Sequence, residues 1–256
     1  MKPLEFIRSL NNRGIWSFTF KEAETLLHKD PTNMIRFLLQ KKRIFNPGRG
    51  FYAIIPEELS ETGRIPMERY IDSLMKFYHL PYYVGLLSAA AHYGSSHQSP
   101  QVLQVIIGKP RRPIIKNMNK IVFFEKKSIE HSIVIQKNTP TGYMRISTPE
   151  STFFDLIKYN RRIGGLDRVY IVALELMEQF TVSGLKDAAR TFPIAIVQRG
   201  GYMLEKLNYV KGQNALLNMI TIQGAVTTSL NPSEVNEGVM NTKWRLLVNS
   251  EIETED

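Results

Sequence analysis

Residues 30–54 read DPTNMIRFLLQKKRIFNPGRGFYAI and decide how the first part of the chain folds. Asp30 is a favourable N-cap residue, and Pro31 suits the first helical turn, where its missing N–H is not needed. The helix that follows is expected to turn three apolar side chains toward a core. These are Met34, Phe37 and Leu38.

A β-hairpin is predicted directly after this helix. Residues 43–45 and 51–54 have the composition of two short strands, and Asn46-Pro47-Gly48-Arg49-Gly50 joins them. The glycines are expected to supply the positive φ angles of the turn. Arg49 is then left at the hairpin tip.

Two shorter helices are predicted before residue 30. The first has apolar residues at three-residue spacing (Leu4, Ile7 and Leu10) and stops at residues 11–14. The second opens at Thr19, which lies three residues before Glu22 and forms a capping box with it. That helix continues through Ala23, Leu26 and Leu27.

The predicted order is three helices followed by a β-hairpin. This order predicts a winged helix-turn-helix domain over residues 1–56. The outer face of the third helix carries residue types that reach base edges and phosphates. The predicted DNA contacts are Thr32, Asn33, Arg36, Gln40, Lys41, Arg43 and Arg49. The alternatives are a helical subdomain with a solvated face and a protein-docking module.

The bulk composition favours a polyanionic partner. The 256-residue chain has a formal net charge of +9, a surplus that suits nucleic-acid binding. It contains no cysteine, which excludes disulfides and thiol catalysis, and no apolar run long enough to span a membrane. Glu5 interrupts the apolar core that a signal peptide would need. We expect a cytoplasmic protein.

The rest of the chain predicts an α+β fold. Residues 57–66 are polar and are expected to form a linker, residues 67–180 an α+β domain, and residues 181–256 a helical C-terminal lobe with an acidic tail. Helices are predicted at 67–78 and 82–93, and strands at 102–107, 121–124, 133–135 and 143–146. Their short spacing favours a small, mostly antiparallel or mixed sheet packed by helices.

A second basic patch lies in this domain. Residues 101–145 hold nine lysines and arginines against two acids. The patch residues are Lys109, Arg111, Arg112, Lys116 and Lys120. They could extend a phosphate footprint, or they could keep a sheet edge from aggregating.

The sequence favours a chain without catalytic activity, cofactor or metal. His92 and His97 do not have the spacing of a zinc-binding helix. Glu150 is expected to form a capping box with Ser147, and Asp155 lies in the same helix. Neither glycine doublet, at 164–165 or 200–201, has the ending of a phosphate-binding loop, and Ser95-Ser96 lacks a nucleophile motif.

Three segments in the middle of the chain carry a family resemblance. They are Tyr82-Tyr83-Val84-Gly85-Leu86-Leu87-Ser88-Ala89-Ala90 with His92-Tyr93-Gly94, then Pro100-Gln101-Val102, then Ser147-Thr148-Pro149-Glu150-Ser151-Thr152-Phe153-Phe154-Asp155-Leu156. In this order, and attached to a winged helix, they resemble the AbiEi-type antitoxins. The resemblance covers most of the chain up to about residue 180.

The resemblance implies a transcriptional autorepressor and antitoxin. Family members bind inverted repeats in the promoter of their own operon and counter AbiEii, a nucleotidyltransferase-like toxin, without a known tight complex. Two copies are expected on a palindromic operator. The alternative is a non-catalytic protein- or RNA-interaction module in which the winged helix is a structural domain.

Overall fold

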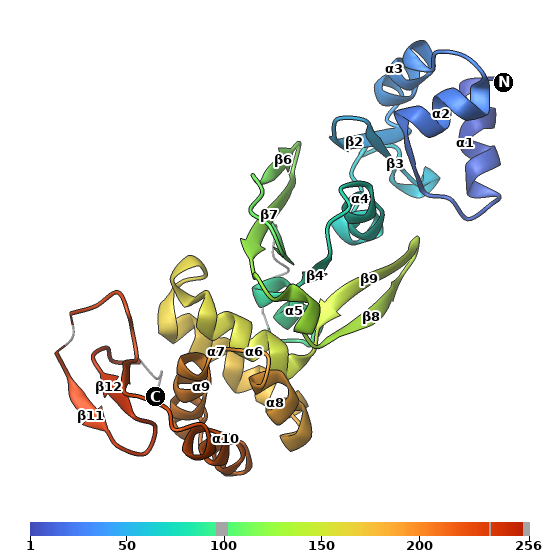
Figure 1. Ribbon diagram of the computed structural model, residues 1–256. Coiled ribbons are helices and arrows are strands. Elements are labelled where there is room, and N and C mark those ends of the chain that lie inside the picture. The colour runs from blue at the N-terminus through green and yellow to red at the C-terminus, as the bar shows by residue number, and fades with distance from the viewer. Residues whose placement is uncertain (96–101, 236, 253–256) are drawn as a thin grey trace. The chain divides into compact units, whose positions relative to one another are not determined.

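The computed structural model describes residues 1–95, 102–235 and 237–252 (Figure 1). It has an α+β fold, and the described residues form ten α-helices and three small sheets. Contacts divide the chain into two compact units. The first comprises residues 1–83, 101–127 and 136–145, and the second comprises residues 84–100, 128–135 and 146–256. The four-part division expected from the sequence, including the linker at 57–66, stays a prediction.

The first 54 residues combine three helices with a three-stranded antiparallel sheet. The elements are α1 (Pro3–Asn11), β1 (Ser17–Thr19), α2 (Phe20–Leu27), α3 (Thr32–Gln40), β2 (Ile44–Gly48) and β3 (Phe51–Ile54), with strand order β1-β3-β2. β1 is an addition to the predicted elements. It pairs with β3, with Ser17 opposite Ala53, and so adds a third strand to the predicted hairpin.

One apolar cluster holds these elements together. Phe6, Ile7, Leu10, Phe18, Ala23, Ile35, Leu38, Ile44 and Ile54 are buried in it. The predicted α1 stripe is therefore correct for Ile7 and Leu10 but wrong for Leu4, which is 42% exposed, whereas Phe6 is fully buried. Thr19 and Glu22 form the predicted capping box, with reciprocal bonds of 3.1 and 2.7 Å.

The chain then runs through two 3-10 turns, η1 (Glu57–Leu59) and η2 (Met67–Arg69), into α4 (Ile71–Phe77) and β4 (Tyr82–Val84). The helix predicted over 82–93 is wrong in its first turn, because Tyr82–Val84 is a buried strand. The helix itself, α5, spans Leu86–His92. Aromatic and β-branched residues at 82–84 favour an extended backbone, which explains the difference.

The largest sheet has the strand order β6-β7-β5-β4-β9-β8 and is mixed, as expected. β5 pairs with β7 in parallel, β6 with β7 in antiparallel, and β4 with β9 in parallel. Its further strands are β5 (Val102–Ile107), β6 (Ile114–Lys116), β7 (Asn119–Glu125), β8 (Val134–Thr139) and β9 (Gly142–Ser147), with η3 (Ile129–His131) before β8. β6 is absent from the predicted strands.

The second unit is built around α6 (Pro149–Lys158), whose residues 150–157 are all buried. Phe153 packs on Phe180, and Phe154 packs on Phe192, each with ring centroids 5.4 Å apart. α6 packs against α7 (Gly165–Leu176), η5 (Met177–Gln179), α8 (Val182–Ala189) and α9 (Ile194–Lys206). η4 (Asn160–Arg162) contacts α7, and α10 (Val210–Ile222) packs on α8 and α9. Figure 1 shows α9 and α10 side by side.

The sequence predicted a helical C-terminal lobe, but this lobe also contains strands. After α10 the chain forms a small sheet of order β10-β12-β11, from β10 (Thr228–Ser229), β11 (Val239–Asn241) and β12 (Leu246–Val248). Trp244 is fully buried and lies against Gly201 of α9, where a side chain would collide with the indole. None of the described helices is both long enough and apolar enough to cross a bilayer.

Candidate nucleic-acid interface

The start of α3 is fixed by Asp30. Its carboxylate accepts hydrogen bonds from the backbone N–H of Thr32 at 2.9 Å and from the Thr32 hydroxyl at 2.6 Å. These bonds lower the pKa of Asp30. Asp30 and Pro31 were expected at the N-cap and in the first turn, but α3 begins at Thr32 with Pro31 at the cap position. The Thr32 hydroxyl donates to Asp30 and is therefore partly engaged.

α3 presents a polar face to solvent. Ile35 and Leu38 are buried in the apolar cluster. Thr32, Asn33, Arg36 and Gln40 are exposed, as predicted. The core assignment of Phe37 is wrong: its side chain is 37% exposed. Its helical spacing places it beside Asn33 and Gln40, four residues before it and three after it. Met34 is half-buried and packs at the margin of the cluster.

Three cationic residues follow at the end of α3. Lys41 is exposed, whereas the Lys42 ammonium donates to the carbonyl of Glu61 at 3.2 Å. Arg43 is half-buried, and its guanidinium lies 3.8 Å from the carboxylate of Glu57. Lys41 is thus available to a ligand, while Arg43 would have to exchange a surface ion pair for a phosphate contact.

One asparagine stabilises the turn of the β2–β3 hairpin. The Asn46 amide donates to the carbonyls of Gly48 at 2.7 Å and Phe51 at 2.8 Å. Arg49 is exposed at the tip. Of the two glycines, only Gly50 has a positive φ, of 83°. Gly48 is needed for space instead, because an added Cβ would collide with the Tyr78 hydroxyl.

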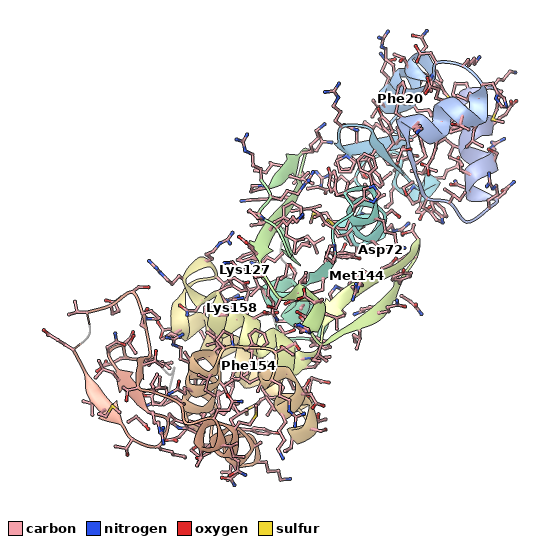
Figure 2. All side chains as sticks on the ribbon, viewed as in Figure 1. Phe20, Asp72, Lys127, Met144, Phe154 and Lys158 are labelled. Carbon is pink, nitrogen blue, oxygen red and sulfur yellow. The ribbon has the colours of Figure 1, made fainter. Side chains whose placement is uncertain are left out.

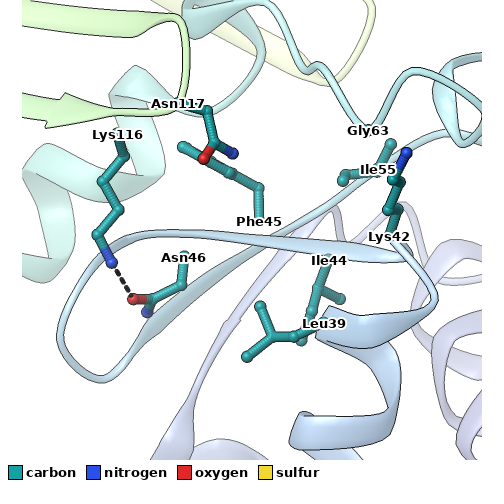
Figure 3. Close-up of a pocket in the computed structure, with 9 residues that line it drawn as sticks. All are labelled: Leu39, Lys42, Ile44, Phe45, Asn46, Ile55, Gly63, Lys116 and Asn117. Carbon is teal, nitrogen blue, oxygen red and sulfur yellow. Dashed lines mark hydrogen bonds between the residues drawn. The ribbon is translucent and has the colours of Figure 1, made fainter.

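Part of the second basic patch contacts this hairpin. The Lys116 ammonium donates to the Asn46 side-chain oxygen at 3.0 Å (Figure 3). The Arg111 guanidinium lies over the ring of Tyr78, 3.4 Å from its centroid. The other members, Lys109, Arg112 and Lys120, are exposed. One of the five patch residues, Lys116, therefore bonds to the hairpin, whereas Arg111 is held by Tyr78 at the end of α4.

An open cavity of about 220 Å³ lies where these elements meet (Figure 3). Its apolar wall includes Leu39 and Ile44, and its cations are Lys42 and Lys116. Leu39, in the last turn of α3, is 39% exposed. The cavity joins the end of α3 to the loop between β6 and β7.

The two acids of α6, Glu150 and Asp155, are both buried. Glu150 is buried and accepts from the backbone N–H of Thr181 at 2.9 Å and from its hydroxyl at 3.0 Å. The capping box predicted with Ser147 is therefore wrong. The N-cap of α6 is Thr148, which accepts from the N–H of Ser151. Asp155 is fully buried within α6, whose neighbouring side chain Phe154 is marked in Figure 2.

The histidines weighed as metal ligands are described only in part. Within residues 1–95, 102–235 and 237–252, no group of three or more His, Asp or Glu side chains is placed to hold a metal. Of the two histidines weighed as ligands, His97 lies outside the described residues. The same is true of Ser96, so the serine pair at 95–96 is described only in part.

Comparisons with known proteins support the family resemblance. A family model described as the AbiEi antitoxin C-terminal domain matches residues 83–206. The crystal structure of the RV2827C protein from Mycobacterium tuberculosis has a similar fold, with a TM-score of 0.64 and 14% sequence identity over 94% of this chain and 89% of that one. Among curated proteins, none matches this sequence.

Proposed function

We propose that this chain, whose residues 83–206 match the model of the AbiEi antitoxin C-terminal domain, is a DNA-binding repressor of its own operon and the antitoxin of a toxin–antitoxin pair. The observation that carries the DNA-binding half is the exposed polar face of α3, which lies beside a hairpin with an arginine at its tip. The element order α1-β1-α2-α3-β2-β3 supports this proposal, because a winged helix-turn-helix would place its third helix in the major groove.

The α3 side chains supply base contacts of three kinds. Arg36 can bind the O6 and N7 atoms of guanine in a bidentate fashion, and Asn33 or Gln40 can bind adenine. Phe37, exposed on the side of α3 that carries Asn33 and Gln40, can pack on the methyl group of thymine. It is an addition to the residues predicted from the sequence.

The phosphate contacts would come from Lys41 and Arg49, with smaller contributions from Thr32 and Arg43. The last two already have protein partners in Asp30 and Glu57. The second basic patch would lengthen this footprint, since Lys116 is bound to the hairpin through Asn46. Each phosphate neutralised steepens the plot of log affinity against log salt by about 0.9.

The test is a titration of the protein into labelled duplex DNA from the upstream region of the gene. Fluorescence anisotropy measures the binding at several salt concentrations. We expect Arg36→Ala to weaken binding by about 1–3 kcal/mol and to relax sequence preference. Arg49→Ala and Arg112→Ala should each flatten the salt slope by about 0.9. Arg8→Ala removes an exposed arginine from α1 and serves as the control.

Binding by Arg36→Ala equal to that of the unmodified protein would contradict the assignment. It would favour instead an interaction module for protein or RNA. The stoichiometry of the titration also tests whether two copies occupy an inverted repeat, as a palindromic site would require.

The antitoxin half needs a separate test. The partner expected for this family is a nucleotidyltransferase-like toxin encoded beside the antitoxin gene. Co-expression from two unrelated promoters should restore growth, and Arg36→Ala should restore it equally because repression plays no part there. Failure of the unmodified chain to rescue growth would contradict the antitoxin role without affecting the DNA-binding result.

A further inference from the structure

A second cationic site lies at the end of α6, in the second unit. It is an open cavity of about 340 Å³. Four of its lining residues are cationic, and none of the described ones is acidic. The cations are Lys158, which Figure 2 labels, and Arg161, Arg162 and Arg199.

Arg199 is the most informative of these residues. It comes from α9 and is only 9% exposed. Its Nε donates to the carbonyl of Ser229 at 3.0 Å, and an Nη donates to the hydroxyl of Thr228 at 3.4 Å. Both acceptors are neutral, and burial lowers the pKa of Arg199. Because a buried cation with neutral partners is costly, an anion in the cavity would stabilise it.

The rest of the lining complements this buried charge. Arg161 is exposed on η4, so it can move toward a ligand at the rim. Tyr159 contributes a half-buried ring, with the Lys158 ammonium 4.9 Å from its centroid. An aromatic ring beside cations is the combination that proteins use to hold a base next to its phosphates.

Cations at the end of α6 also complement the helix dipole. That explanation suits Lys158, which lies in the last turn of α6. It leaves Arg199 unexplained, because Arg199 belongs to another helix. The carbonyl of Ile157 in the last turn already accepts from the Asn160 amide at 2.8 Å.

We propose that this cavity binds the phosphate groups of a nucleotide, with Arg199 and Arg161 as the phosphate ligands and Tyr159 beside the base. The guanidinium group has five N–H donors in a fork that matches phosphate oxygens, and two bonds to Ser229 and Thr228 leave part of the Arg199 fork for a ligand. The volume of about 340 Å³ lies within the range of small-molecule sites. The proposal does not depend on DNA binding through α3.

The experiment is calorimetric titration of the full chain with ATP in the presence of EDTA. Inorganic phosphate and a single-stranded RNA oligonucleotide without a 5′-phosphate are titrated in parallel. We expect ATP to bind, and Arg161→Ala and Arg199→Gln each to weaken it by roughly 10- to 100-fold, the effect of losing a charge-assisted hydrogen bond. Arg190→Ala, an exposed arginine in the same unit paired with Asp187, should bind ATP normally.

Three results would overturn the proposal: no binding of ATP, equal binding by all variants, or binding of the RNA without ATP. Inorganic phosphate that binds as tightly as ATP would also overturn it, because the site would then recognise an anion and not a nucleotide. If Arg199→Gln fails to fold, the ATP affinities of Arg161→Ala and Arg190→Ala still test the proposal. Arg36→Ala should retain ATP binding, which separates this result from the DNA-binding test.

Discussion

The first 54 residues and the family-matched region at 83–206 are stabilised in different ways. Where both partners belong to the first region, side-chain hydrogen bonds join residues two to five apart, such as Asp30 with Thr32 and Asn46 with Phe51. In the second region, buried polar side chains bond across the chain. Glu150 accepts from Thr181, 31 residues away, and Gln198 donates to the carbonyl of Trp244, 46 residues away. Local signals therefore specify the first region, and long-range packing specifies the second.

We expect the largest loss of stability from a substitution that removes the long-range packing of Trp244. This side chain is fully buried, lies against Gly201, and donates its indole N–H to Glu205 at 2.6 Å. Trp244→Ala should lower the free energy of unfolding of the second unit by about 3–5 kcal/mol, the cost of emptying an aromatic site in a core. Far-ultraviolet circular dichroism in urea measures this, because the second unit carries α5 to α10.

Trp16 is the one other tryptophan of the chain, so it reports on the first region in the same sample. We expect its fluorescence transition to stay near the unmodified midpoint, because every contact named for Trp244 lies in the second unit. An equal shift of both transitions would show that the two regions unfold together. They would then differ in how far apart their hydrogen-bonded residues lie in the sequence, but not in stability.

The difference between the regions also explains what the sequence could predict. Thr19 and Glu22 are three residues apart, so their capping box is visible in the sequence. Glu150 has the same spacing from Ser147, yet its carboxylate binds Thr181 instead. A motif at short range cannot show that a distant backbone N–H competes for the same acceptor. For the same reason nothing in the sequence marked Gln198 or Arg199 as buried polar residues of α9.

The candidate interface shows the same limit on a smaller scale. Residues 34, 35, 37, 38 and 39 are all apolar, so they surround most of α3 and periodicity alone cannot choose the buried side. Packing buries Ile35 and Leu38 and leaves Phe37 exposed. The polar residues of α3 were predictable because they fall on one face. Lys116 could be assigned to a basic patch, but its contact with Asn46, 70 residues away, could not.

A smaller effect is expected from the local hydrogen bond at the start of α2. Thr19→Ala removes the acceptor of the Glu22 N–H, and should lower the free energy of unfolding of the first region by about 1 kcal/mol. The measurement is Trp16 fluorescence in a Trp244→Phe background. Thr25→Ala is a matched control, because the Thr25 hydroxyl only donates to the carbonyl of Lys21 within the same helix. Equal losses in both variants would mean that the cap has no special role.

The smallest effect concerns Glu205, which joins α9 to the small C-terminal sheet. Burial raises the pKa of Glu205, but hydrogen bonds from Lys243 and Trp244 outweigh it and hold the pKa below the ordinary value of 4.5. Its ionised form therefore stabilises the fold above that pH, and the contribution is lost as the pH falls through the lowered folded pKa.

Glu205→Gln keeps an acceptor for the indole N–H but loses the charge that faces the Lys243 ammonium at 2.7 Å. Because this pair is partly exposed, the variant should lose about 0.2–1 kcal/mol of unfolding free energy at pH 7. The difference should shrink toward zero as the pH falls below the lowered pKa of Glu205. Trp244 fluorescence in urea, recorded across this range, measures the difference. A difference that stays constant with pH would assign the role of Glu205 to shape and hydrogen bonding alone, and the link between α9 and the sheet would then owe nothing to charge.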